Sequence, residues 1–151
     1  MDLVLAKESI DNIISALDDD VLRAGADCVL LFDRSGNLIV NRGDPANLDV
    51  VALAALSAAN FGATAEIAKL IGEDDFALLF HKGKNENIHF TKVGKGFILI
   101  TLFGKDVSLG LIRLNTARVT DPLIPYLGGD PQPVRFFTLV NTTSNGESGF
   151  T

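Results

Sequence analysis

Hydrophobic residues along three segments recur at spacings of three and four, the period of an α-helix with one buried side. The first segment covers 3–22. The second runs from about 48 to 71, with Asn47 as the expected N-cap and Gly72 as the stop. The third begins near Ser108 and extends into the 110s. The pattern therefore predicts one helix at each end of the domain and a long one in its middle.

Five short apolar runs bounded by turn residues predict β-strands. They cover about 28–32, 38–40, 76–82, 88–93 and 97–103. All residues of the run "FILITLF" except Thr101 are apolar, and "CVLLF" is nearly as apolar. Successive side chains of a strand point to opposite faces, so we expect both strands to be covered on both faces. Neighbouring runs are joined by short hairpins, which predicts a mostly antiparallel sheet. The expected fold class is α+β, a five-stranded sheet with helices on both faces, in one domain over 1–127.

The central helix has two stripes of different size. We expect the stripe with the larger aliphatic residues to pack on the sheet, and it consists of Leu53, Leu56, Asn60, Ala63, Ile67 and Leu70. The opposite stripe is small almost throughout and consists of Val51, Ala55, Ala58, Gly62, Ala65 and Lys69. Two explanations remain open: alanine is a good helix former that tolerates water, or a second surface packs closely there. The polar residues Asp49, Asn60, Glu66 and Lys69 argue against a membrane span, as does the lack of a flanking aromatic or basic belt.

Composition excludes several classes of protein. The chain has 151 residues and a net charge of −6 without a block of basic residues, which disfavours nucleic acid or anionic membrane as the main partner. Cys28 is the single cysteine, so an intrachain disulfide is excluded, and its apolar surroundings indicate a buried structural residue. The start "MDLVLAKESID" has no signal-peptide pattern, so we expect a cytoplasmic protein.

The sequence offers no recognisable catalytic group. His81 and His89 are expected to face each other across a hairpin, but zinc needs at least one more ligand, so we predict no metal site. The phosphate-loop, dinucleotide-binding and nucleophile-elbow motifs are missing from the sequence. We therefore expect neither a cofactor nor an enzymatic activity of the chain's own.

The last part of the chain, 128–151, has a different composition. Pro122 and Pro125 interrupt the final helix, "GGDPQP" is typical of a linker, and "NTTSNGESGFT" is polar. Between them lies "VRFFTLV", which is either an additional edge strand or a segment that docks on a partner.

Three stretches together resemble the roadblock/LC7 domain: "VLLFDRSGNLIV", "LAALSAANFGATAEIAKLIGEDDF" and "ILITLFGKDVSLGLIRL". The hairpin text "FHKGKNENIHFTKVGKGFILI" is most similar to MglB-like bacterial members. The resemblance covers roughly 5–120. It implies an α/β/α sandwich that forms a homodimer, in which the third strand pairs with its copy through Phe76, Leu78 and Phe80, and the second helices lie side by side.

MglB-like proteins bind a small Ras-like GTPase of the MglA type on that helical face. The resemblance therefore implies that this protein stimulates the GTP hydrolysis of the GTPase, and in some cases its nucleotide exchange. It would do so without an arginine finger, in bacterial polarity or gliding motility. The matching positions are Ala55, Ala58, Ala59, Gly62, Ala63 and Glu66. Val51 and Ala65 of the small stripe complete the predicted GTPase-binding and dimer face. Glu66 departs from the small residue that the family pattern implies.

Three hypotheses follow. The first is a homodimeric GTPase regulator, and the second is a structural adaptor of the same fold that leaves GTP turnover unchanged. A turnover assay separates these two. The third is a domain that holds a small molecule between helix and sheet, for which Asn60 in the large stripe is the only support.

Overall fold

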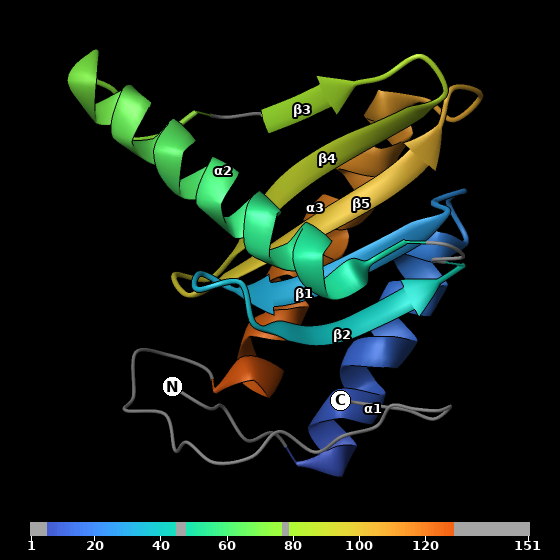
Figure 1. The fold of residues 1–151 in the computed structure, drawn as a ribbon. Helices are drawn as coiled ribbons and strands as arrows, with labels where there is room; N and C mark the ends of the chain where they lie inside the picture. The colour runs from blue at the N-terminus through green and yellow to red at the C-terminus, as the bar shows by residue number, and fades with distance from the viewer. Residues whose placement is uncertain (1–5, 45–47, 77–78, 129–151) are drawn as a thin grey trace.

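A five-stranded antiparallel sheet in the order β2-β1-β5-β4-β3 forms the centre of the computed structural model (Figure 1). The structure describes residues 6–44, 48–76 and 79–128. The strands are β1 (Cys28–Asp33), β2 (Leu38–Gly43), β3 (Leu79–Lys82), β4 (Glu86–Val93) and β5 (Phe97–Gly104). Helix α2 (Val50–Leu70) lies on one face. Helices α1 (Lys7–Ala16) and α3 (Leu109–Leu123) lie on the other, with the π-helical turn η1 (Leu17–Leu22) after α1 and the 3₁₀ turn η2 (Ile124–Leu127) after α3.

The predicted order of elements and the antiparallel sheet are confirmed. Strands β1 and β5 are buried on both faces, as their continuous apolar runs indicated. Their alternate residues belong to two separate cores. Val29, Leu31 and Leu99 pack with α1, η1 and α3, whereas Leu30 and Ile100 pack with α2.

Several boundaries differ from the expectation. Strand β3 begins only at Leu79, so Phe76 precedes the strand, and Leu78 lies outside the described residues. The N-cap of α2 is Asp49, whose carboxylate accepts a hydrogen bond from the Ala52 N–H at 3.0 Å; the expected cap, Asn47, is outside the described residues. A carboxylate suits this position because it also faces the positive end of the helix dipole.

The predicted stop of α2 is confirmed in detail. Gly72 adopts a φ of 82°, its N–H donates to the Lys69 carbonyl at 3.1 Å, and the Glu73 N–H donates to the Ala68 carbonyl at 2.8 Å. This pair of bonds is the Schellman motif, which requires a left-handed residue that glycine adopts without strain.

The orientation of α2 predicted from its two stripes is wrong. Its buried residues are Ala54, Ser57, Ala58, Phe61 and Ala68. The larger aliphatics Leu56, Ile67 and Leu70 are 70%, 53% and 85% exposed. On this face of the sheet the large side chains belong to the strands, and the small residues of α2 let the helix approach the strands closely. Only Phe61 reaches far, and its ring stacks on Phe90 with centroids 6.4 Å apart.

The turn between β1 and β2 gives a second reason for alanine in α2. Gly36 has a φ of 92°, and a Cβ placed there would lie 2.8 Å from the Cα of Ala55. The backbone of the turn therefore touches the backbone of the helix. A larger side chain at Gly36 would push the two apart.

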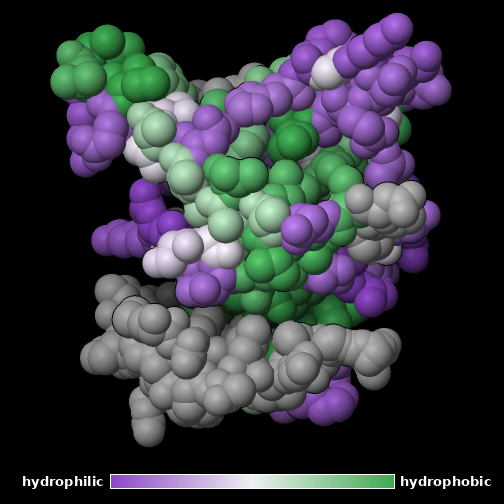
Figure 2. Space-filling view, viewed as in Figure 1, coloured by the Kyte–Doolittle hydropathy of each residue, from purple (hydrophilic) through white to green (hydrophobic). Residues whose placement is uncertain are grey.

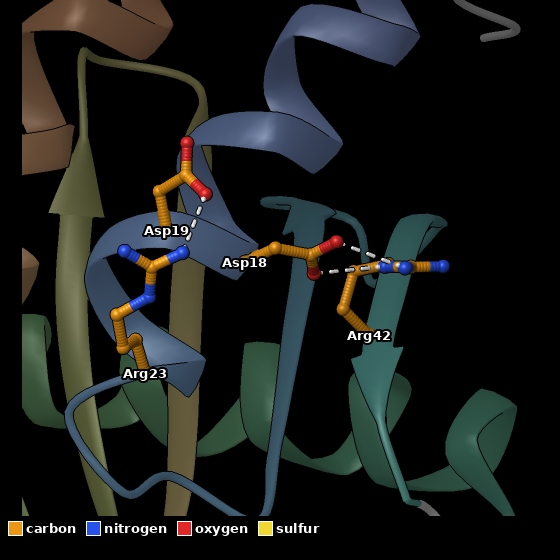
Figure 3. Close-up of polar contacts among 4 residues, drawn as sticks. All are labelled: Asp18, Asp19, Arg23 and Arg42. Atoms are coloured by element: carbon orange, nitrogen blue, oxygen red, sulfur yellow. Dashed lines mark hydrogen bonds and ion pairs between the residues drawn. The ribbon is translucent and has the colours of Figure 1, made fainter.

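The three aspartates at 18–20 lie in the π-helical turn η1. Asp18 accepts two hydrogen bonds from Arg42 of β2, at 3.1 Å from Nε and 2.9 Å from Nη2 (Figure 3). This bond raises the pKa of Arg42 above its ordinary value. Both side chains are more than a third exposed, so we expect the pair to contribute no more than about 1 kcal/mol. Its effect is to fix η1 against the edge strand.

Candidate functional site

The outer face of α2 is the largest run of exposed apolar side chains along the described chain. We define this face by Val51, Leu56, Ile67, Leu70 and Ile71, which are 53% to 85% exposed. Figure 2 shows the apolar residues from the middle of the view to the upper-left end, where α2 extends past the sheet in Figure 1. Exposed apolar surface of this extent is typical of a protein interaction site.

Charge on this helix is confined to its last turns. Lys69 donates to Glu66 at 3.1 Å, so these two side chains neutralise each other. By length and composition α2 is the one helix among the described residues that could cross a membrane. Its other side, however, is packed on the sheet through Ala54, Ala58 and Phe61.

The predicted binding residues fall into two groups. Six of the eight lie on or beside the outer face: Val51, Ala55, Ala59, Ala63 and Glu66 are exposed, and Gly62 is half-buried. Ala58 is 7% exposed and faces the sheet, so its assignment to an outer surface is wrong. Ala65 is half-buried on the same inner side.

The residues that sequence reasoning missed are Leu56, Ile67 and Leu70, because they were assigned to the core. A signal for the correct orientation does exist in the sequence. Ala54, Ala58, Phe61, Ala65 and Ala68 follow steps of four and three, and this set includes the one aromatic residue of α2. The stripe around the aromatic residue is the buried one.

Within the part of the chain that the structure describes, strand β3 forms one edge of the sheet, and its outer side has no neighbouring strand. The Gly83 N–H donates to the Glu86 carbonyl at 2.9 Å, and the register continues through His81↔Ile88 and Leu79↔Phe90. In an antiparallel ladder, alternate residues point their N–H and C=O groups away from the partner strand. Phe80 and Lys82 therefore direct their backbone groups toward the free edge.

The side chains of β3 connect this edge to both helical layers. On the α3 side the ring of Phe80 stacks on Phe103, with centroids 6.1 Å apart. On the α2 side the His81 ring lies 5.3 Å from Phe90, and its Nε2 is 3.4 Å from Nδ2 of Asn60. Asn60, the one support for a small-molecule site, thus contacts the edge strand. The helix and the strand edge form one continuous surface.

The two histidines do not face each other, contrary to expectation. The register pairs His81 with Ile88 and His89 with Phe80, so the two rings lie on opposite faces of the sheet. His89 is buried beneath α3, and burial together with the Arg113 charge lowers its pKa to about 4. Within the ranges that the structure describes, no three His, Cys, Asp or Glu side chains group in a way that could hold a metal ion.

Cys28 is buried as expected. Burial, with the charges of Asp27 and Asp44, raises the pKa of its thiol to about 12. The thiol is therefore protonated at neutral pH and is a poor nucleophile.

Comparison with known proteins is consistent with this arrangement. The model of the roadblock/LC7 domain family matches residues 16–103, more than half of the chain. The chain belongs to the roadblock/LC7 family. Its fold is similar to that of Myxococcus xanthus MglB, with 38% identity, a TM-score of 0.70, and 74% of this chain and 91% of that chain covered.

Two further MglB structures are similar to this roadblock/LC7 chain at 28% identity. The gliding protein MglB of Thermus thermophilus has a TM-score of 0.76, with 83% and 96% of the chains covered. An MglB with a tetrameric arrangement has a TM-score of 0.77, with 83% and 95% covered. An uncharacterized Aquifex aeolicus (strain VF5) protein is 26% identical over 110 residues. The match covers 72% of this chain and 66% of that protein, slightly less than two thirds of its length.

Proposed function

We propose that this protein is a homodimeric regulator of a small Ras-like GTPase of the MglA type, whose GTP hydrolysis it stimulates in the cytoplasm. The observation that carries the proposal is the unpartnered apolar outer face of α2 beside the free edge of β3. The similarity to MglB structures and membership of the roadblock/LC7 family support a regulatory role. Bacterial polarity or gliding motility is the proposed process.

The dimer would form by pairing two β3 strands. The outward N–H and C=O groups of Phe80 and Lys82 can bond to an antiparallel copy, which continues the sheet. Pairing of the two β3 strands would also bring the two α2 helices side by side above the junction between the protomers. It would cover part of each outer face and leave the rest for the GTPase.

The decisive experiment mixes the full-length protein with the MglA-type GTPase of the same organism and follows both complex formation and GTP turnover. We expect binding in the GTP-bound state and faster hydrolysis. Binding without any change in turnover would contradict the regulatory function and support the structural adaptor instead. Failure to bind would refute both the partner and the surface.

A proline at Lys82 is expected to abolish the dimer without unfolding the protomer. Lys82 is exposed and its N–H points to the free edge, so proline removes an intermolecular bond but none inside the protomer. Sedimentation equilibrium should show a monomer for Lys82→Pro and a dimer for the control Lys82→Ala. A Lys82→Pro dimer of unchanged strength would rule out pairing through β3.

Two substitutions at Gly62 separate folding from binding. A Cβ at Gly62 meets nothing within 4 Å, so Gly62→Ala is expected to raise the free energy of unfolding by about 0.5–1 kcal/mol. Gly62→Arg has the same room and should also fold, but its long charged side chain would stand on the proposed docking surface. We expect it to abolish GTPase binding in a pull-down and turnover assay. Normal stimulation by Gly62→Arg would exclude this part of α2 from the interface.

A further inference from the structure

The first half of α3 has two leucines on its outer side and two polar residues on its inner side, next to the buried Ile112. Leu111 and Leu114 face outward and are 43% and 53% exposed. Asn115 and Thr116 face inward and are buried, with Asn115 donating to the Leu111 carbonyl at 2.8 Å and Thr116 to the Arg113 carbonyl at 3.2 Å. The core contacts of α3 are made by Ile112, Val119 and Leu123, so these two leucines form a separate apolar surface on the outer side.

The sheet under this half of α3 has three buried polar side chains beside Phe103. Asn87, His89 and Thr101 are 3%, 5% and 0% exposed, and they share the face on which α3 packs. The Asn87 Oδ1 and Thr101 Oγ1 atoms have no hydrogen-bond partner among the described residues. Packing inside the protomer thus leaves Leu111 and Leu114 about half exposed.

Two guanidinium groups lie on either side of Leu114 around the helix axis, and Leu111 lies beyond the second of them. Arg113 and Arg118 are exposed on α3, and at about 100° per residue they lie about 140° apart around its axis. Within the described ranges neither forms an ion pair. Small residues, Gly110 and Ala117, lie between them and make the surface shallow. We call Gly110, Leu111, Leu114 and Ala117 the α3 outer stripe. It is an apolar strip with one arginine on each side of Leu114 and Asp121 at its C-terminal end, on a protein whose net charge is −6.

We propose that the α3 outer stripe docks an amphipathic helix of another protein, one whose apolar side is bordered by aspartate or glutamate. Small residues next to two leucines suit ridge-into-groove packing of a second helix, and carboxylates on its borders would pair with Arg113 and Arg118. The chain's own segment "VRFFTLV" fits less well because Arg135 would add a third cation, and a second copy would set arginine against arginine.

This surface is independent of the proposed GTPase site. Helix α3 lies on the opposite face of the sheet from α2, so both surfaces are accessible at once (Figure 1). The protein would then connect a partner at α3 to whatever binds α2. This inference does not require that the α2 partner be a GTPase.

The test uses the full-length protein and two synthetic helical peptides with the same leucine stripe, one bordered by glutamates and the other by lysines. The protein has no tryptophan, so a single tryptophan in each peptide reports binding by fluorescence. We expect the glutamate peptide to bind and the lysine peptide to bind at least about tenfold more weakly. Equal binding of both peptides, or of neither, would overturn the proposal.

Matched variants locate the site. Leu111→Glu/Leu114→Glu should lose at least about tenfold in affinity for the glutamate peptide, whereas Leu56→Glu/Leu70→Glu on α2 should leave it unchanged. Arg113→Glu/Arg118→Glu should reverse the preference between the two peptides. All four leucines are exposed, so folding is not at risk, and circular dichroism checks this. Unchanged binding by the α3 leucine variant, or no reversal by the arginine variant, would refute the docking site.

Discussion

Leu56→Glu is expected to weaken binding of the proposed MglA-type GTPase strongly while leaving the protein folded. Leu56 is 70% exposed in the N-terminal half of α2 and would be buried if a partner covered the outer face. Its loss, together with an unpaired carboxylate in an apolar contact, should weaken binding by about 2–4 kcal/mol, or roughly 30- to 1,000-fold. Isothermal titration calorimetry against the GTP-bound GTPase measures the change directly.

The control is Leu114→Glu, the same substitution at an exposed leucine on the other face of the sheet. It should bind the GTPase like the unmodified protein, since Leu114 is 53% exposed on α3. Wild-type affinity of Leu56→Glu would contradict the placement of the GTPase on α2. A comparable loss with Leu114→Glu would show that the two faces are not independent.

The second large effect concerns His89 and acidic pH. Burial lowers its pKa to about 4, from an unfolded value near 6.5, with Arg113 adding a like charge nearby. Between these two values the unfolded chain binds more protons than the folded one, so stability falls as the pH falls from 6.5 to 4. The loss assigned to His89 is about 3 kcal/mol over that window.

Replacing His89 by glutamine removes this dependence. Urea unfolding of His89→Gln between pH 7 and pH 4 should decline less steeply than that of the unmodified protein, by about 3 kcal/mol at pH 4. His81→Gln is the matched control because His81 is exposed on the other face. Parallel stability curves for His89→Gln and the unmodified protein would show that His89 titrates normally in the folded state.

The sequence was most informative where hydrophobicity and turn residues pointed to the same structure. The runs at 28–32 and 97–103 are apolar on both faces, and they form two neighbouring inner strands. Gly72 lies where a left-handed residue must end α2. These features depend on local chemistry, which a single sequence records well.

The remaining errors concern choices that depend on distant residues. Helix α2 has apolar residues on both stripes, so periodicity alone does not show which side packs on the sheet. The large side chains of Phe90 and Ile100 on the sheet leave room only for a side of the helix whose residues are mostly small. The histidines were misplaced because the β3–β4 hairpin pairs Gly83 with Glu86, one residue away from the assumed register. A shift of one residue moves a side chain to the opposite face.

The ion pair between Asp18 and Arg42 has a consequence for how large an assembly can grow. If protomers join at β3, the combined sheet ends on both sides in β2. On β2 the charged Arg42 side chain is held by Asp18, and the turn η1 lies against the strand. A charged side chain and a covering turn on an edge strand disfavour the addition of a further strand. Growth along the sheet would therefore stop at two copies, and higher assemblies would have to form through the helical faces.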